Sequence, residues 1–175
     1  APPQKGQSIE QPVTISLREA YDGTQRRISK DGRQITVKIP AGAATGTKVR
    51  LEGEGGPGLY GGEAGDLFLV VSVTPDHTFE RDGDDLSVDV EVDAFTAMLG
   101  GHVEVPTMSR AVRLKIPGGT QSGRKFRLNS KGMPRLRGRD QYGDLYVRIL
   151  ITVPTELNDD QRQQIEALRD SFNAS

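Results

Sequence analysis

Residues with the type and spacing for phosphate chemistry occur in one glycine-rich stretch. Gly53–Gly58 reads GEGGPG, which has the G-x-G-x-x-G spacing of a dinucleotide-binding turn and follows a predicted strand. Such a turn opens a helix whose N-terminus holds the pyrophosphate. Pro57 and the glycines up to Gly62 cannot begin that helix. We therefore interpret this stretch as a flexible loop.

The sequence has few residues that could bind a metal ion or act as a catalytic nucleophile. His77 and His102 are the only histidines and the chain has no cysteine, which leaves too few ligands for a zinc site and excludes disulfides and thiol catalysis. Ser122 and Ser130 lie near basic residues, but no base stands at the spacing of a hydrolase motif. We therefore predict no catalytic site, no metal and no cofactor, and expect a protein that is not an enzyme.

Two surface features remain as candidates for binding. The strands around Val13–Ile15 and Arg26–Ile28 form an outer layer whose apolar residues are more than so small a core needs. An exposed aliphatic groove beside an open strand edge would bind a peptide by strand addition. The second feature is a basic cluster that phosphates could use, although a solvated surface would have the same composition. The cluster consists of Arg124, Lys125, Arg127, Lys131, Arg135, Arg137 and Arg139.

The segments that position these features occur twice in the chain, as an internal duplication. Ile35–Leu51 (ITVKIPAGAATGTKVRL) recurs as Val112–Leu128 (VRLKIPGGTQSGRKFRL), at a constant offset along the sequence. Gly65–Phe68 recurs as Gly143–Tyr146 after a slip of one residue. Only two copies exist, so we predict two similar domains in series rather than a solenoid.

Each copy predicts the same order of elements. Alternating apolar residues from Val13 predict a strand, and Ser16 with Glu19 forms a capping box for a short helix that ends at Gly23. Asp31-Gly32 then predicts a hairpin, followed by two more strands on either side of a glycine-rich loop. The fold class is therefore all-β, with two tandem β-sandwiches that contain short helices.

The composition of the chain argues against several other classes of protein. The chain has 175 residues, and its 23 basic and 24 acidic residues give a net charge of -1, so no global charge favours nucleic acid or an anionic membrane. No apolar run approaches the ~20 residues that a membrane span needs. The absence of cysteine is compatible with a reducing compartment. The first residues, APPQKGQ, are typical of a linker from a longer protein.

The periodicity changes after Pro154. Apolar residues fall on one side of a predicted helix, with Asn158 as its N-cap and Gln161 at the third helical position. The apolar side could dock on the protein's own sheet or meet the same helix of a second copy, and the pattern favours neither. These apolar residues are Leu157, Ile165, Leu168 and Phe172.

Six motifs, in family order, closely resemble the C-terminal substrate-binding region of DnaJ-type co-chaperones. They are Lys38–Gly42 (KIPAG), Gly65–Val71 (GDLFLVV), Pro75–Leu86 (PDHTFERDGDDL), Lys115–Gly119 (KIPGG), Lys131–Pro134 (KGMP) and Gly143–Val147 (GDLYV). The zinc-containing class of this family inserts four Cys-x-x-Cys pairs where this chain has only Lys30–Arg33. The chain thus resembles the zinc-free class, similar to the curved-DNA-binding-protein (CbpA) group. It contains no His-Pro-Asp tripeptide, so we expect it to represent the family's C-terminal region without the J-domain.

The resemblance implies a linker remnant at 1–10, a peptide-binding sandwich at 11–80, a second sandwich at 81–155 and a dimerisation helix at 156–175. It places the peptide groove on Val13, Ile15, Ile28 and Phe79. In eukaryotic members the groove also takes the acidic tail of the partner chaperone, which Arg26, Arg27 and Lys30 would steer. Leu157, Ile165, Leu168 and Phe172 would make the contacts of a V-shaped homodimer.

The function that we expect is a non-catalytic, cytoplasmic chaperone module. It would bind unfolded or hydrophobic segments reversibly and deliver them to a DnaK-type chaperone, without contacting a membrane. The first alternative is DNA binding through the basic cluster, which would weaken steeply with salt. The second is a dimerisation scaffold without a client groove.

Overall fold

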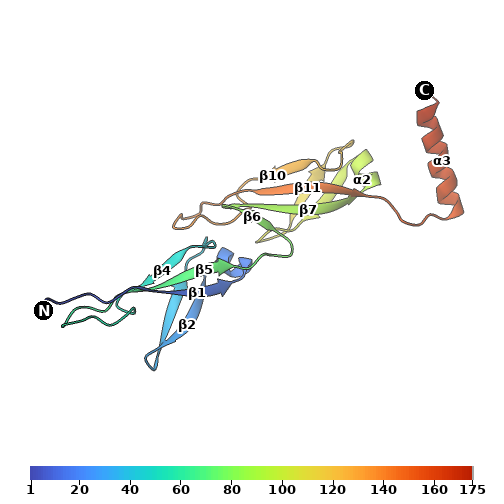
Figure 1. Cartoon of the computed structure of the whole chain (residues 1–175). Coiled ribbons are helices and arrows are strands. Elements are labelled where there is room, and N and C mark those ends of the chain that lie inside the picture. The colour runs from blue at the N-terminus through green and yellow to red at the C-terminus, as the bar shows by residue number, and fades with distance from the viewer. Residues whose placement is uncertain (175) are drawn as a thin grey trace.

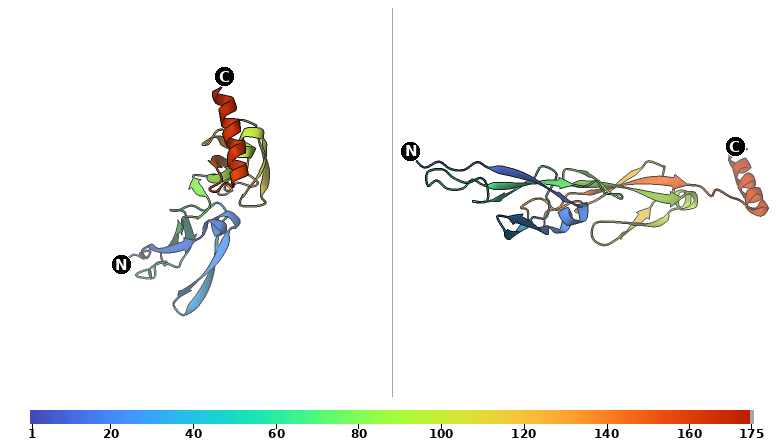
Figure 2. Two further views of the ribbon diagram at one scale, coloured as in Figure 1. Left: turned by 90° about the vertical axis from the view of Figure 1, so that its right-hand side faces the viewer. Right: turned by 60° about the horizontal axis from the view of Figure 1, so that its bottom comes forward.

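The computed structural model describes residues 1–174 and has two similar β units in series, followed by a separate C-terminal helix (Figure 1). The views in Figure 2 show an elongated molecule with the N-terminus at one end and the last helix at the other. This arrangement confirms the all-β prediction with short helices and a C-terminal helix. Ser175, the end of the predicted range 156–175, lies outside the described residues.

The first unit contains one sheet, one helix and one hairpin. Its sheet has the order β1-β5-β4, in which β1 runs parallel to β5 and β4 antiparallel to it. The hairpin of β2 and β3 packs on this sheet around a small apolar core. The elements are β1 (Ile9–Ile15), α1 (Leu17–Asp22), β2 (Thr24–Lys30), β3 (Arg33–Ile39), β4 (Lys48–Leu51) and β5 (Leu67–Val73).

The second unit repeats this plan and adds one edge strand. Its sheet has the order β10-β11-β7-β6, with β7 and β11 parallel, and β8 pairs with β9 in a second hairpin. The elements are β6 (Glu80–Asp82), β7 (Asp85–Asp93), α2 (Ala94–Leu99), β8 (Gly101–Val105), β9 (Val112–Ile116), β10 (Lys125–Leu128) and β11 (Leu145–Thr152). The order of elements predicted from the duplication is thereby confirmed.

An aspartate at the same place in each unit ties the strand ends together. Arg50 donates to Asp66 from Nε at 2.9 Å, and Arg127 donates to Asp144 in the same way at 2.8 Å. A backbone N–H also donates to each aspartate, and these hydrogen bonds are the largest cause that lowers the pKa of both carboxyl groups. The duplication therefore preserves a local ion pair as well as a topology.

Polar side chains cap the start of α1, α2 and the C-terminal helix, and those of Ser16 and Asn158 were predicted. The Ser16 hydroxyl accepts from the Glu19 N–H at 3.0 Å, and the Glu19 carboxylate accepts from the Ser16 N–H at 3.1 Å. Asp93 caps α2, and Asn158 caps α3 (Asp159–Asn173) in a reciprocal pair with Gln161. Each cap satisfies backbone donors that the first helical turn leaves unpaired.

The N-terminal residues form more structure than the predicted linker at 1–10, so that prediction is corrected. β1 begins at Ile9, and Gln4 exchanges two backbone hydrogen bonds with Leu59 at 2.9 Å. Gly56 also donates to the carbonyl of Gln7 at 2.8 Å, so the glycine-rich loop that we predicted to be flexible is held by residues upstream of the first strand. Contacts this close need glycine, because a Cβ at Gly62 would lie 2.0 Å from the Gln4 carbonyl oxygen.

The two units are joined by more than the connecting chain. The half-buried guanidinium of Arg81 donates to the carbonyls of Ala43 at 2.7 Å and Gly42 at 3.1 Å. Arg18 on α1 donates to the carbonyl of Met108 in the second unit. The main apolar core also includes side chains from both units.

Candidate peptide-binding surface

The first unit has two open strand edges on the side of α1. Neither edge pairs with another strand among the residues that the structure describes. Strand β1 ends its sheet, and its residues with odd numbers direct their main-chain groups at β5: Ile9 donates to Asp66, and Ile15 accepts from Thr74, both at 2.9 Å. The alternate residues therefore direct theirs away from β5. One of them is Pro12, which has no N–H, so this edge is a poor template for another strand.

The other edge belongs to β2. Asp31 and Gly32 both have positive φ, 50° and 75°, as a two-residue type I′ hairpin turn requires. The residues on either side of such a turn exchange hydrogen bonds, so the pairing of Lys30 with Arg33 sets the alternation along β2. Arg27 and Ser29 consequently direct their N–H and C=O groups away from β3, where a peptide strand could pair with them.

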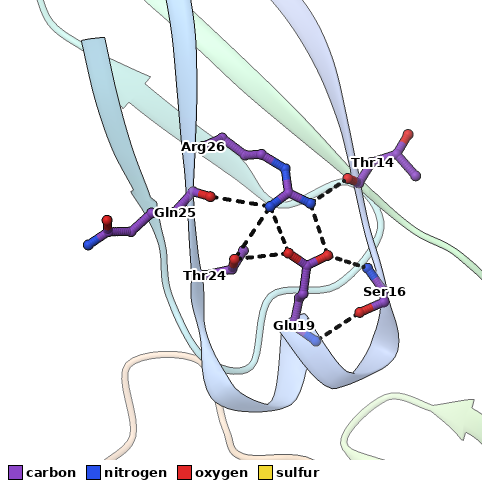
Figure 3. Close-up of polar contacts among 6 residues, drawn as sticks. All are labelled: Thr14, Ser16, Glu19, Thr24, Gln25 and Arg26. Atoms are coloured by element: carbon purple, nitrogen blue, oxygen red, sulfur yellow. Dashed lines mark hydrogen bonds and ion pairs between the residues drawn. The ribbon is translucent and has the colours of Figure 1, made fainter.

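A network around Arg26 closes one end of the space between the two edges (Figure 3). Its guanidinium donates to both carboxylate oxygens of Glu19, at 2.7 and 2.9 Å. It also donates to the carbonyl of Thr14 on β1 at 3.1 Å and to the carbonyl of Gln25 on β2 at 3.2 Å. The hydrogen bond from Arg26 is the main reason why the pKa of Glu19 is lowered to about 2.

Lys30 closes the other end. Its Nζ donates to the carbonyl of Glu54 and, at 2.8 Å, to that of Gly55. The Glu54 carboxylate lies 3.8 Å from Lys30 and 3.0 Å from Arg33. Both ends of the β2 edge are thus held by cations that already have carboxylate partners.

Apolar side chains lie between these two ends. Ile28 and the partly buried Val13 pack together in the smaller core. Ile28 is 9% exposed, so it contributes mainly to that core and offers a small contact area at the surface. The other members of the smaller core are Ile35, Val37, Val49, Leu51, Leu67 and Leu69.

The four predicted groove residues do not share one environment. Ile15 is 1% exposed and Phe79 is 8% exposed, and both belong to the larger core that continues into the second unit. The structure thus corrects the expectation of an open furrow lined by all four side chains. Ile15 lies on the inward face of β1, and Phe79 lies in the segment between β5 and β6, where it is buried in the larger core.

The three predicted steering cations also differ. Arg26 and Lys30 are engaged by Glu19 and Glu54. Arg27 points to the opposite face of the hairpin because alternate residues of a strand face opposite sides, and it is exposed. Sequence reasoning missed Thr14, Glu19 and Glu54 as parts of this surface, although the capping box had already located Glu19 beside the end of β1.

The predicted dimerisation residues lie at the far end of the molecule. α3 has no buried residue, and Ile165, Leu168 and Phe172 expose much of their side chains, whereas Leu157 is partly buried. The helix thus presents an apolar side outside the two cores.

The basic cluster is divided among several environments. Arg127 pairs with Asp144 at 2.7 Å, and the guanidinium of Arg124 lies over the ring of Phe126, 4.7 Å from its centroid. Lys125 stands on β10 beside Arg127. Lys131, Arg135, Arg137 and Arg139 belong to the loop between β10 and β11.

Residues 1–174 offer neither a metal centre nor a membrane-spanning helix. No group of three or more histidine, cysteine or acidic side chains among them could hold a metal ion. None of the helices in this range is long and apolar enough to cross a membrane.

Comparisons with known proteins assign both β units to one family. The family model described as the DnaJ C terminal domain matches residues 9–154. A chaperone protein DnaJ from Deinococcus proteolyticus is 43% identical over 164 residues, which are 94% of this chain and 50% of that protein. Those from Streptococcus mutans and Parageobacillus thermoglucosidasius are 47% identical over 146 residues and 48% over 134. These matches cover 83% and 77% of this chain but 38% and 35% of the relatives, so the chain spans half of their length or less.

Proposed function

The chain belongs to the DnaJ C-terminal domain family, and on that premise we propose that it is a chaperone module that binds unfolded or hydrophobic polypeptide segments without catalysis. The family match covers both β units, and the relatives carry the name chaperone. Client segments would bind beside β2 in the first unit.

The observation that carries this proposal is the open edge of β2. Arg27 and Ser29 direct main-chain groups outward there, and Ile28 and Val13 supply apolar contacts next to them. A peptide that paired with this edge would form main-chain hydrogen bonds irrespective of its sequence, which suits many clients. The stretch from Arg26 to Lys30 spans about 13 Å, at roughly 3.3 Å per residue, so it accepts about three to five residues of a client.

The energetics favour weak and reversible capture. A buried client side chain such as leucine contributes about 1.5 to 3 kcal/mol, and each net hydrogen bond about 1 kcal/mol. Val13 and Ile28 would make the client contacts, while Ile15 and Phe79 would support them from the core. A site of this size releases its client readily.

A homodimer through α3 would compensate for the weakness of one site. Neither core includes a residue of α3, and pairing its apolar side with a second copy would bury Leu157, Ile165, Leu168 and Phe172. Two arms on one client raise the effective concentration for the second contact. Such a dimer would then deliver the client to a DnaK-type chaperone in the cytoplasm.

An acidic tail of that chaperone is a second candidate ligand for the same edge. Arg27 is the exposed cation of β2, so it would attract the tail by long-range charge. Arg26 and Lys30 would contribute less, because Glu19 and Glu54 offset their charges.

Two proline variants test the proposed edge. Ser29→Pro removes an N–H that points away from β3, so the hairpin should stay folded while a client strand loses a donor. Thr36→Pro makes the matched change on the outer edge of β3, because Thr36 lies opposite Arg27 in the register. Ser29→Pro should weaken binding of an extended apolar peptide at least about tenfold and reduce suppression of aggregation, whereas Thr36→Pro should change neither. Unchanged binding by Ser29→Pro would reject strand addition at β2.

A further inference from the structure

Residues 4–7 form an N-terminal strap that lies against the glycine-rich loop between β4 and β5 (Figure 1). Gln4 exchanges two backbone hydrogen bonds with Leu59 at 2.9 Å, and the N–H of Gly6 donates to the carbonyl of Glu63 at 2.8 Å. The two partners stand before and after the tip of the loop, so the strap is held by both of its arms.

The strap and the loop approach so closely that only glycine fits where they meet. A Cβ at Gly6 would lie 2.0 Å from the carbonyl oxygen of Gly56, and a Cβ at Gly65 would lie 2.1 Å from that of Gln7. Neither Gly6 nor Gly65 has a positive φ, so these positions need glycine for space. Among the described residues, the two apolar cores include none from the strap or the loop, so this local structure can open while the cores stay folded.

A single peptide group joins the strap to the open edge of β2. The carbonyl of Gly55 and the N–H of Gly56 belong to the same rigid plane, and in a trans peptide they point in opposite directions. The carbonyl accepts from Nζ of Lys30 at 2.8 Å, and the N–H donates to the carbonyl of Gln7 at 2.8 Å. The orientation of this peptide group therefore depends on the strap on one side and on Lys30 on the other.

Lys30 has its partners on the loop. Its Nζ donates to the carbonyls of Glu54 and Gly55, and the Glu54 carboxylate lies 3.8 Å away. These contacts hold a side chain that is only 20% exposed across one end of the space between the β1 and β2 edges. A loop that moves must release Lys30 as well.

We infer that the N-terminal strap is a latch that controls access to the β2 edge. With the strap in place, the loop holds Lys30 across the end of the edge. When the strap leaves, the Gly55–Gly56 peptide loses one of its two anchors, Lys30 is freed, and the end of the edge opens to a client. The inference rests on the proposed function and adds a regulation of the same site.

Two variants release the strap in different ways. Gly6→Ala places a methyl group against the Gly56 carbonyl, and deletion of residues 1–7 removes the strap without adding an atom, while β1 still begins at Ile9. Gln4→Ala is the matched control, because Gln4 is exposed and alanine keeps its backbone hydrogen bonds. Circular dichroism verifies that each variant is folded.

The accessibility of Lys30 tests the latch without any client. An amine-reactive label, located by mass spectrometry, should modify Lys30 about fivefold faster in both released variants, the factor that corresponds to one lost hydrogen bond. Gln4→Ala should match the unchanged chain, and Lys115, an exposed residue of β9, serves as the reference in every sample. Labelling of Lys30 that stays slow in both released variants would overturn the inference.

Binding of an uncharged, extended apolar peptide tests the consequence for the edge. Both released variants should bind it a few-fold more tightly in fluorescence anisotropy. Lys30→Met removes the closing side chain itself, so adding Gly6→Ala to it should have no further effect. Additive effects, or faster labelling of Lys30 with unchanged peptide binding, would show that the strap does not control the edge.

The Ser29→Pro variant keeps this inference separate from the proposed function. Weaker binding by Ser29→Pro, together with no effect of releasing the strap, rejects the latch and leaves the β2 edge as the client site. If Ser29→Pro binds normally, the β2 edge fails as the client site and the latch fails with it as a control on client access.

Discussion

Arg26 donates to the main-chain carbonyl of Thr14 at 3.1 Å, so a side chain from β2 occupies the open edge of β1. The same guanidinium is held by Glu19, whose position at the start of α1 is set by its reciprocal cap with Ser16 (Figure 3). A helix cap therefore determines how much of the space between the two strand edges is closed. Substitutions at the cap or at Arg26 should change how this surface binds.

Removing the guanidinium should open this end of the surface. In Arg26→Ala the carbonyls of Thr14 and Gln25 lose their shared donor, so they become free to accept from a client's main chain. We expect an uncharged apolar peptide to bind a few-fold more tightly, as measured by fluorescence anisotropy, with a lower unfolding midpoint. Weaker binding would contradict this view and make Arg26 a direct client contact.

The Glu19–Arg26 pair should make stability depend on acid. The pKa of Glu19 is lowered from 4.5 to about 2, first by the hydrogen bond from Arg26 and next by that from the Ser16 backbone. Because the folded state has the lower pKa, the stabilisation is complete above about pH 4.5 and is lost as the pH falls toward 2.

Glu19→Gln is the appropriate comparison, since glutamine can keep the helix cap. Denaturant unfolding should show the unchanged chain about 1 kcal/mol more stable than Glu19→Gln at pH 7, a modest value because the pair is partly exposed. The difference should shrink at pH 3. A constant difference would show that the ion pair does not contribute.

Arg27 should carry most of the preference for acidic ligands. Arg27→Gln is expected to weaken binding of an acidic peptide several-fold at low salt and to leave an uncharged peptide unaffected, because exposed charges act over about 10 Å at 0.1 M salt. Arg26→Gln should alter this preference less, since Glu19 already offsets its charge. If Arg27→Gln and Arg26→Gln weakened binding of the acidic peptide equally in a salt titration, Arg27 would not be the dominant cation.

The contact between the two units should depend on Gly42. Its φ is +91°, and a Cβ there would lie 2.6 Å from the carbonyl oxygen of Pro134. Gly46 has a similar φ, +96°, with nothing near its Cβ position, so Gly46→Ala isolates the backbone strain. Strain of this kind costs of order 1 kcal/mol, and Gly42→Ala should destabilise by clearly more in denaturant unfolding. Equal losses would show that the loop of Pro134 moves aside without cost.

Truncation before Leu157 should convert a dimer into a monomer. The shortened chain loses α3 but keeps both cores, because α3 has no buried residue. Sedimentation velocity should show half the mass, with an unchanged unfolding midpoint. A dimer that survives the truncation would place the interface elsewhere.

Local signals were sufficient for most of the fold. The duplication predicted two equivalent units, and Ser16 and Asn158 each cap a helix as their side chains predicted. The Asp31-Gly32 turn fixed the register of the β2–β3 hairpin. These features depend on neighbours a few residues apart, or on a pattern repeated along the chain, so the amino-acid sequence alone is sufficient to predict them.

The candidate surface depended on contacts that no local pattern contains. Strand alternation separates one face from the other, but it cannot distinguish Ile15, sealed in the core, from Val13, which is partly exposed. The charges of Arg26 and Lys30 were visible in the sequence, whereas their carboxylate partners come from α1 and from the loop at Glu54. By itself the sequence determined the repeated units, their caps and their family. Only the tertiary structure decided which strand edge stays open and which cations are already neutralised, because burial and ion pairing depend on segments that folding brings together.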